Sequence, residues 1–232
     1  MSTSQQVSQI KNAAREYLDT FRMENNPYFV ALRDRSMSLD AFRVTQEQFF
    51  FAVTYFPRPM AILIGRIPDP SLRLDILRNL VEEHGDFKEQ DFHHSTFKRF
   101  LHSLGSDPEK LTSLPIWPAL RSFNSVLNSV CLTEEIDFAV ACMGIIELAF
   151  GEISDWIGRA VVDRGWVLPN QLVHYKRHAE IDERHAEEFF SAIQSGWNDE
   201  KRKQLIAHGL EMGAYIFNLL YSEMHKGGMQ GR

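Results

Sequence analysis

The sequence predicts an all-α fold, a single domain of seven to eight helices, and three observations lead to this prediction. Apolar residues recur at three- and four-residue spacing along most of the chain. Strand-like alternation of polar and apolar residues is essentially absent. One segment, residues 133–162, is apolar on nearly all sides, which is typical of the central helix of a bundle. A chain of 232 residues suits one domain, residues 1–232, with a full core.

Prolines and polar turns divide the first half of the chain. The first amphipathic segment ends before Asn25-Asn26-Pro27, after which a short apolar piece follows. Ser38 is a predicted N-cap for a long helix that Pro57 and Pro59 should kink. Pro70 is well placed to open the next helix, and Gly85 should end it. The helices expected in this half are 4–24, 38–67, 70–84 and 90–104.

The second half is predicted to contain a short helix, the central helix, a helix rich in histidine and acids, and a final amphipathic helix. Thr133, followed by two glutamates, should open the central helix. The last seven residues, 226–232, are rich in glycine and are expected to form a flexible tail. The four helices expected here are 118–130, 133–162, 170–195 and 198–225.

Composition and charge exclude several classes of function. The net charge is −6 and no basic cluster could follow a phosphate backbone, so we expect no nucleic-acid partner. The N-terminus lacks the apolar region of a signal peptide, and the run FFFAVTYF is too short to span a bilayer. Only two cysteines occur, Cys131 and Cys142, which favours a reducing compartment. We therefore expect a cytoplasmic protein with no membrane partner.

The segment HYKRHAEIDERH, residues 174–185, has the clearest functional pattern. His178, Asp182 and His185 stand at i, i+4 and i+7, so at about 100° per residue they fall within roughly 60° of arc on one helix face. Imidazole and carboxylate groups that converge in this way bind iron, zinc or manganese. The alternative is a solvated stripe in which Asp182 pairs with a neighbouring arginine. Acids and histidines on other inward faces would decide between the two.

Glu83 is predicted to be a buried acid. It shares the apolar face of residues 70–84 with Ile76 and Leu80. Glu82 instead lies on the polar face, four residues after Arg78, and should pair with it in solvent. An acid on an apolar face is costly unless it is paired or bound to a metal.

Two further polar residues are expected on inward faces. His93 belongs to the apolar face of residues 90–104, whereas His94 aligns with Lys98 and should be exposed. Glu147 lies in the stretch GIIELAF of the central helix and is therefore expected to be buried. The alternatives are a hydrogen-bonded core histidine at position 93 and an ion pair with an arginine or lysine at position 147.

Together these residues form a set of three carboxylates and three imidazoles from four helices. A bundle with this set can hold two metal ions roughly 3.5–4 Å apart with bridging carboxylates. Oxygen and imidazole ligands without thiolate suit iron or manganese, and two ferrous ions can deliver electrons to O2. We expect Glu147 to bridge the ions and to be the catalytic residue. The predicted metal ligands are Glu83, His93, Glu147, His178, Asp182 and His185.

Six stretches of the chain resemble a known family. They are NPYFVAL (26–32), YFPRPM (55–60), NLVEEHGD (79–86), FKRFLHSLG (97–105), IIELAFGEI (145–153) and HAEIDERHAEE (178–188). Their order resembles the haem-oxygenase-like di-iron oxidases, relatives of thiaminase II and of pyrroloquinoline-quinone synthase, and especially the CADD-like proteins. The resemblance implies a haem-oxygenase-like fold without haem, with two Fe²⁺ ions, or alternatively manganese, on the six ligands above. Glu82, His84 and His94 compete with Glu83 and His93 for the first pair of ligands.

The resemblance implies an enzyme that uses O2 to oxidise a small organic molecule. Members of the family cleave fatty or amino acids, oxygenate nitrogen or, in CADD-like proteins, form p-aminobenzoate from one of their own tyrosines. Phe29 stands in place of that tyrosine, Thr45 and Ile146 in place of neighbouring pocket tyrosines, and Ile157 near the place of a reactive lysine. We therefore expect a di-iron oxidase acting on an amino acid, amine or carboxylic acid. A p-aminobenzoate synthase is the alternative.

The substrate pocket is predicted to be apolar. Aromatic side chains, Trp156 among them, occupy the helices that should line it, although plain core packing would give the same pattern. The expected partners are O2, the small-molecule substrate and an external electron donor, and relatives often form homodimers. The predicted pocket residues are Phe29, Phe49, Phe50, Phe56, Ile146 and Phe150.

Two other classes of function are weighed against the oxidase. A metal-free hydrolase similar to thiaminase II needs a nucleophilic cysteine in the pocket. Cys142 lies on the same expected helix as Glu147, residues 133–162, but it precedes Glu147 by five residues and so points about 140° away from it. A protein-interaction module without redox activity would have little reason to bury three acids beside three histidines.

Overall fold

The computed structural model describes residues 3–230, which form ten α-helices and no strand. The all-α prediction is confirmed. The helix count exceeds seven to eight because residues 27–33 form a helix of their own and because the kink at Pro57 divides the segment 38–67 in two. The helices are α1 Thr3–Thr20, α2 Pro27–Arg33, α3 Leu39–Tyr55, α4 Pro57–Arg66, α5 Leu74–Glu83, α6 His93–Ser103, α7 Pro118–Thr133, α8 Ile136–Asp163, α9 Val173–Ile193 and α10 Glu200–Met229.

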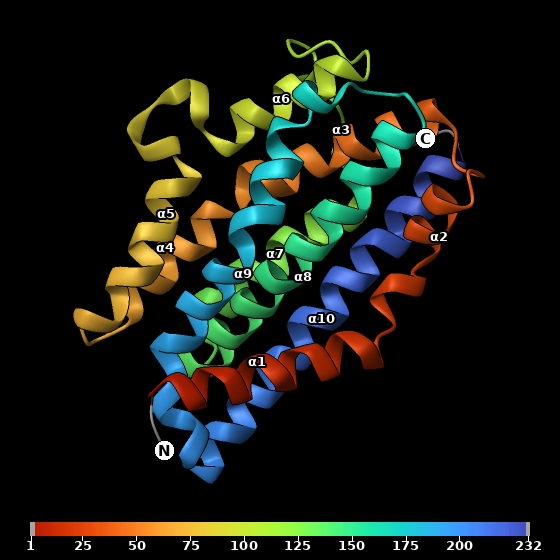
Figure 1. Cartoon of the computed structure of the whole chain (residues 1–232). Helices are drawn as coiled ribbons and strands as arrows, with labels where there is room; N and C mark the ends of the chain where they lie inside the picture. Colours follow the sequence, from red (N-terminus) through yellow and green to blue (C-terminus); the bar gives the residue numbers. More distant parts are fainter. Residues whose placement is uncertain (1–2, 231–232) are drawn as a thin grey trace.

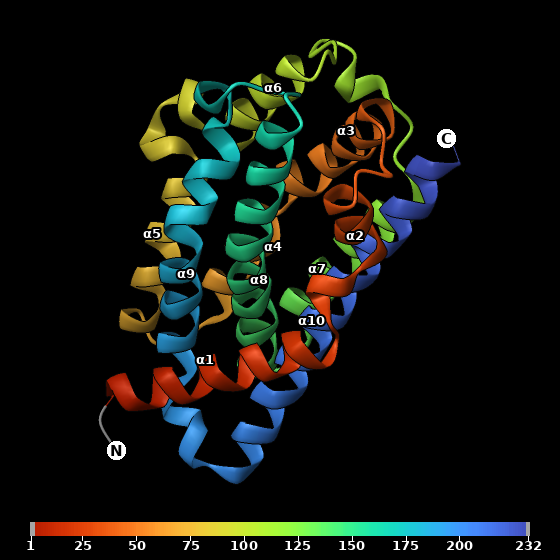
Figure 2. The same ribbon diagram turned by 45° about the vertical axis from the view of Figure 1, so that its right-hand side comes forward.

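Helix α8 forms the centre of the bundle, as its all-round apolar sequence predicts. It packs along its length against α9 on one side and α10 on the other (Figure 2). Helix α1 crosses the ends of α9 and α10, and α5 covers the outer side of α9 (Figure 1). Residues 139–150 of α8 are all buried, so side chains from this helix reach the interior in every direction. No helix of residues 3–230 combines the length and apolar character needed to cross a bilayer.

Glycines allow α10 to approach α8 closely. A Cβ atom on Gly209 would lie 2.2 Å from the carbonyl oxygen of Phe138, and one on Gly213 would lie 2.4 Å from Cγ2 of Ile145. Neither distance is compatible with a side chain at these positions. The close contact fixes the position of α8 and therefore of the residues it carries.

Local signals set several helix ends as the sequence predicts. The side chain of Ser38 accepts a hydrogen bond from the backbone N–H of Ala41, 3.1 Å away, and so caps α3. Gly85 has φ +55° directly after α5, and a Cβ there would lie 2.4 Å from the carbonyl carbon of Asp91. This tight turn brings the end of α5, with Glu83, next to the start of α6, with His93.

The C-terminal tail differs from its prediction. Residues 226–229 continue α10 instead of forming a flexible end, and Gly227 and Gly228 are buried. A Cβ on Gly227 would lie 2.4 Å from the Trp117 ring, and one on Gly228 would lie 2.6 Å from Thr45. The glycines are therefore required by close packing, not by chain flexibility. The last two residues of the predicted tail, 231–232, lie outside the described residues.

Candidate metal centre

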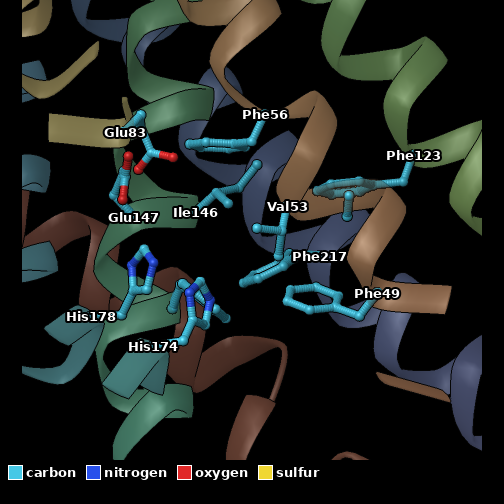
Figure 3. Close-up of a pocket in the computed structure, with 12 residues that line it drawn as sticks. Phe49, Val53, Phe56, Glu83, Phe123, Ile146, Glu147, His174, His178 and Phe217 are labelled. Atoms are coloured by element: carbon cyan, nitrogen blue, oxygen red, sulfur yellow. The ribbon is translucent and has the colours of Figure 1, made fainter. Parts of the chain in front are cut away.

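The structure brings together all six residues that the sequence singled out as metal ligands. Glu83 comes from the end of α5, His93 from the start of α6 and Glu147 from the middle of α8, and the other three come from α9. Figure 3 shows Glu83 and Glu147 facing each other, with His178 below them. The relative exposures of the six are Glu83 6%, His93 1%, Glu147 2%, His178 5%, Asp182 0% and His185 0%.

Short distances link the six side chains into one cluster. Nδ1 of His93 lies 2.8 Å from Oε1 of Glu83, and Nδ1 of His178 lies 2.9 Å from Oδ1 of Asp182. The rings of His93 and His178 are 4.5 Å apart between centroids, so these two pairs adjoin. On the far side, Nδ1 of His185 lies 3.7 Å from Oδ1 of Asp182 and 3.9 Å from a carboxylate oxygen of Glu147.

The unpaired nitrogen atoms of this cluster fit a metal site. Nε2 of His93, Nε2 of His178 and Nδ1 of His185 are buried, and none has a hydrogen-bond partner among residues 3–230. Buried polar atoms without partners are rare because each loses its bonds to water. Glu83, Glu147 and His185 each contribute one donor atom to a group whose members all lie within 4.8 Å of one another, close enough to share an ion. Three nitrogen and three carboxylate donors therefore suit cations such as iron or manganese.

The charges of the buried acids also favour a cation. Burial raises the pKa of Glu147 to about 8, and the charge of Glu83 adds to this effect. Burial, with the charges of Glu147 and Glu83, raises the pKa of Asp182 well above its ordinary value. Burial acts on Glu83 in the same direction, but the adjacent His93, together with His185 and His84, outweighs it and holds the pKa of Glu83 below its ordinary value. Three buried acids this close need positive charge nearby before all of them can ionise.

Glu82 has a different position from the one predicted. It does not pair with Arg78 in solvent, because α5 packs against α9 and the Glu82 carboxylate meets that helix. Oε2 of Glu82 lies 2.6 Å from Nη2 of Arg184 and 3.1 Å from Nε2 of His185, while Arg78 pairs with Asp75. The hydrogen bonds with His185 and Arg184, and the charges of these two residues, lower the pKa of Glu82 to about 2.

This contact gives Glu82 a role beside the cluster. With Nε2 of His185 turned to Glu82, Nδ1 of the same ring faces Glu147 and Asp182. A carboxylate on the outer nitrogen of a histidine is a common way to orient a metal ligand. The other competitors lie outside the cluster. Nδ1 of His84 is 2.8 Å from the Leu80 carbonyl oxygen, and His94 is half-buried against Phe92.

An apolar cavity adjoins the cluster (Figure 3). Four of the six predicted pocket residues line it, namely Phe49, Phe56, Ile146 and Phe150. The lining residues that the sequence analysis missed are Ala52, Val53, Phe123, His174 and Phe217.

Phe29, Phe50 and Trp156 do not line this cavity. The Phe29 ring packs between Trp156 and Tyr221, at centroid distances of 5.4 and 4.6 Å, away from the cavity. Phe50 follows Phe49 in α3 and therefore points about 100° away from it, toward Phe51 and Lys98. Helical spacing from Phe49 indicates Ala52 and Val53, and four-residue spacing from His178 indicates His174. No local signal indicates Phe123 or Phe217, which come from α7 and α10.

Cys142 is not placed to act as a nucleophile in this cavity. It is fully buried and does not line the cavity, and its carbonyl group packs against Gly213 of α10. Burial raises the pKa of its thiol, which disfavours the reactive thiolate. The structure therefore gives no support to the cysteine hydrolase.

Relatives of known identity resemble the chain at low sequence identity. The 4-aminobenzoate synthase of Nitrosomonas europaea is 24% identical over 139 residues, 56% of this chain and 55% of that protein, so the match spans just over half of its length. The 4-aminobenzoate synthase of Chlamydia trachomatis is 22% identical over 186 residues, 80% of this chain and 79% of that protein.

Solved structures establish the fold. A Shewanella denitrificans domain of unknown function, described as having a heme oxygenase-like fold, matches with a TM-score of 0.78 and 16% identity, covering 97% of this chain and 94% of that one. A CADD-like protein of unknown function from Nostoc punctiforme matches with a TM-score of 0.77 and 12% identity, covering 95% and 99%. The predicted haem-oxygenase-like fold is confirmed. A family model described as "Iron-containing redox enzyme" matches residues 43–217, three-quarters of the chain, and the protein therefore belongs to this family of iron-containing redox enzymes.

Proposed function

We propose that this protein is a non-haem di-iron oxidase that uses O2 to oxidise a small organic molecule held in the apolar cavity. One observation carries the proposal: three buried histidine nitrogens without partners lie beside three buried carboxylates at the end of that cavity. Membership of the iron-containing redox family supports iron and redox chemistry. The number of ions and the use of O2 are inferred from the size and type of the donor set.

The six residues would hold two ferrous ions, and Glu147 is central to the donor set because one of its oxygens lies within 4.8 Å of donor atoms of both Glu83 and His185. When bound, the ions would supply electrons and open coordination positions for O2, and an external donor would restore the electrons. Manganese would suit the same donors.

Neighbouring residues would keep the site in a fixed geometry. Glu82 holds the His185 ring through its outer nitrogen, and Arg184 balances the charge of Glu82. The aromatic side chains of the cavity exclude water from the substrate side of the centre. Protons held by Glu147 and Asp182 in the metal-free protein would leave when cations bind.

A p-aminobenzoate synthase is the second candidate, because the relatives in Nitrosomonas europaea and Chlamydia trachomatis carry that name. The resemblance places Phe29 where such proteins have the tyrosine that they consume, and a phenylalanine has no hydroxyl group. Incubation with ferrous iron, a reductant and O2, followed by mass spectrometry for 4-aminobenzoate, distinguishes the two. Release of this compound in amounts near one per chain would favour the synthase.

Anaerobic titration with Fe²⁺, followed by exposure to O2, tests the oxidase. We expect two irons per chain and O2 uptake that depends on them. His93→Ala should lower the iron content to one or fewer, whereas His102→Ala, an exposed histidine on the same helix, should leave it unchanged. Wild-type protein that retains no iron, or that loses iron equally in both variants, would refute the proposal.

A further inference from the structure

His174 lines the apolar cavity at its border with the candidate metal centre. It precedes His178 by four residues on α9, so it lies one turn along the same face. Figure 3 shows its ring between His178 and the aromatic side chains of the cavity. The ring centroids of His174 and His178 are 4.4 Å apart, and His174 is 1% exposed. None of the six ligand assignments uses this residue.

The hydrogen-bond network from α6 favours the tautomer of His174 with its proton on Nδ1. The hydroxyl group of Thr96 donates to the carbonyl oxygen of His93, 2.9 Å away, and this uses its only hydrogen. Thr96 Oγ1 also lies 3.0 Å from Nδ1 of His174, and with the Thr96 hydrogen directed at His93 we assign the ring proton to Nδ1, which then donates to Oγ1. A neutral imidazole carries one hydrogen, and the contact with Thr96 assigns it to Nδ1. Nε2 therefore has a free lone pair and no hydrogen.

The acceptor at Nε2 has no partner in the part of the chain that the structure describes. Nε2 of His174 is buried and makes no hydrogen bond with any residue of 3–230. Five of the twelve residues that line the cavity beside it are phenylalanines, for example Phe49, Phe150 and Phe217. A buried acceptor on a residue that lines an apolar cavity gains most from a molecule that brings its own N–H or O–H group.

We propose that Nε2 of His174 accepts a hydrogen bond from an N–H or O–H group of the substrate. The cavity then selects a molecule with an apolar body and a hydrogen-bond donor close to the metal centre. A carboxylate has no hydrogen to donate and would meet the lone pair of Nε2, so amines and hydroxyl compounds are favoured over carboxylic acids at this position. The inference rests on the proposed function in taking this cavity as the substrate site.

Binding of small aromatic probes to chelator-treated, metal-free protein tests the inference. Calorimetry would compare phenol and aniline, which carry O–H and N–H donors, with toluene, which has neither, and with benzoate. His174→Phe keeps a ring but removes the acceptor. We expect the affinity ratio of phenol or aniline to toluene to fall about tenfold in this variant, because the donor is left buried without a partner. Phe217→Leu is the matched control and should change all the affinities while keeping the ratio within about twofold.

A second variant keeps the inference testable if His174→Phe fails to fold. Thr96→Val keeps His174 but removes the oxygen that orients its ring, so the same ratio should fall at least about threefold. Unchanged ratios in both variants, or benzoate binding as tightly as phenol, would overturn the inference. Loss of one iron per chain in His174→Phe would also overturn it, because His174 would then be a metal ligand. Absence of iron binding in the wild type would refute the oxidase and leave the probe ratios unaffected.

Discussion

Replacing Glu147 by glutamine should stabilise the metal-free protein, although most core substitutions destabilise. Burial raises the pKa of Glu147 to about 8 in the folded chain, against 4.5 for an ordinary glutamate. Between these two values the folded chain retains a proton that the unfolded chain releases. The free energy of unfolding therefore falls as the pH rises from 4.5 to 8. The stability that the neutral Glu147 gives the folded chain is fully present only below pH 4.5. Glutamine does not ionise in either state and avoids this loss.

The size of the effect follows from the same two values. One pH unit of differential protonation is worth about 1.4 kcal/mol, so the loss between pH 4.5 and pH 7 approaches about 3 kcal/mol. The glutamine carbonyl can keep the contact with Nδ2 of Asn79, 3.5 Å from the carboxylate oxygen that it replaces. We expect Glu147→Gln to gain about 2–3 kcal/mol at pH 7 and less than about 1 kcal/mol at pH 5.

Urea unfolding of the metal-free proteins at pH 5 and pH 7 measures this gain. Glu180→Gln is the control, because Glu180 lies on the exposed side of α9 and should change stability little at either pH. Added Mn²⁺ should stabilise the wild type more than the Glu147→Gln variant, because the variant lacks one carboxylate ligand. A variant that is no more stable than the wild type at pH 7, or a gain that does not grow between pH 5 and pH 7, would refute the reasoning.

Three further outcomes are expected. Glu82→Gln should weaken Mn²⁺ binding about 10- to 100-fold in a metal titration, because it loosens the His185 ring while keeping all six proposed ligands. An unchanged affinity would contradict the proposal that Glu82 orients His185. Metal affinity should rise between pH 6 and pH 8 with release of protons into a weak buffer, since the buried acids must ionise; affinity independent of pH would contradict their raised pKa values. Gly209→Ala should lower the free energy of unfolding, measured in urea, by at least about 2 kcal/mol, because its Cβ would meet the Phe138 carbonyl. Gly65 has open space around it, so Gly65→Ala should not destabilise the protein. Equal effects of the two substitutions would refute the close helix contact.

Features set by neighbouring residues along the chain were predicted well from the sequence. Helical spacing indicated the all-α class, and Ser38 and Pro57 indicated where helices begin or bend. The convergence of His178, Asp182 and His185 also needed only one regular helix. Their meeting with Glu83, His93 and Glu147 could be anticipated because each of those residues lies on the apolar face of its own helix, and apolar faces turn to a common core.

Features that depend on which faces meet were not predicted. Glu82 lies on the polar face of α5 taken alone, but that face packs against α9 and brings the carboxylate to His185. The glycines near the C-terminus resemble a loose tail in the sequence, yet Gly227 and Gly228 fit against side chains more than 100 positions earlier. Phe29 and Phe49 are equally aromatic, and only the packing of their helices separates a core ring from a cavity ring.

His174, His178, Asp182 and His185 form a polar stripe along one face of α9, and the length of this stripe supports different roles for its two ends. From His174 to His185 the helix rises about 16 Å, at 1.5 Å per residue. Two metal ions about 4 Å apart can be reached from only part of that length. At one end, Nδ1 of His185 meets Glu147 and Asp182 while Glu82 holds its other nitrogen. At the other end, His174 is held by Thr96 of α6 and borders the phenylalanine-lined cavity. Under the proposed function, the same residue type on the same face would serve the metal at one end and the substrate at the other, and the hydrogen-bond partner from a second helix would distinguish them.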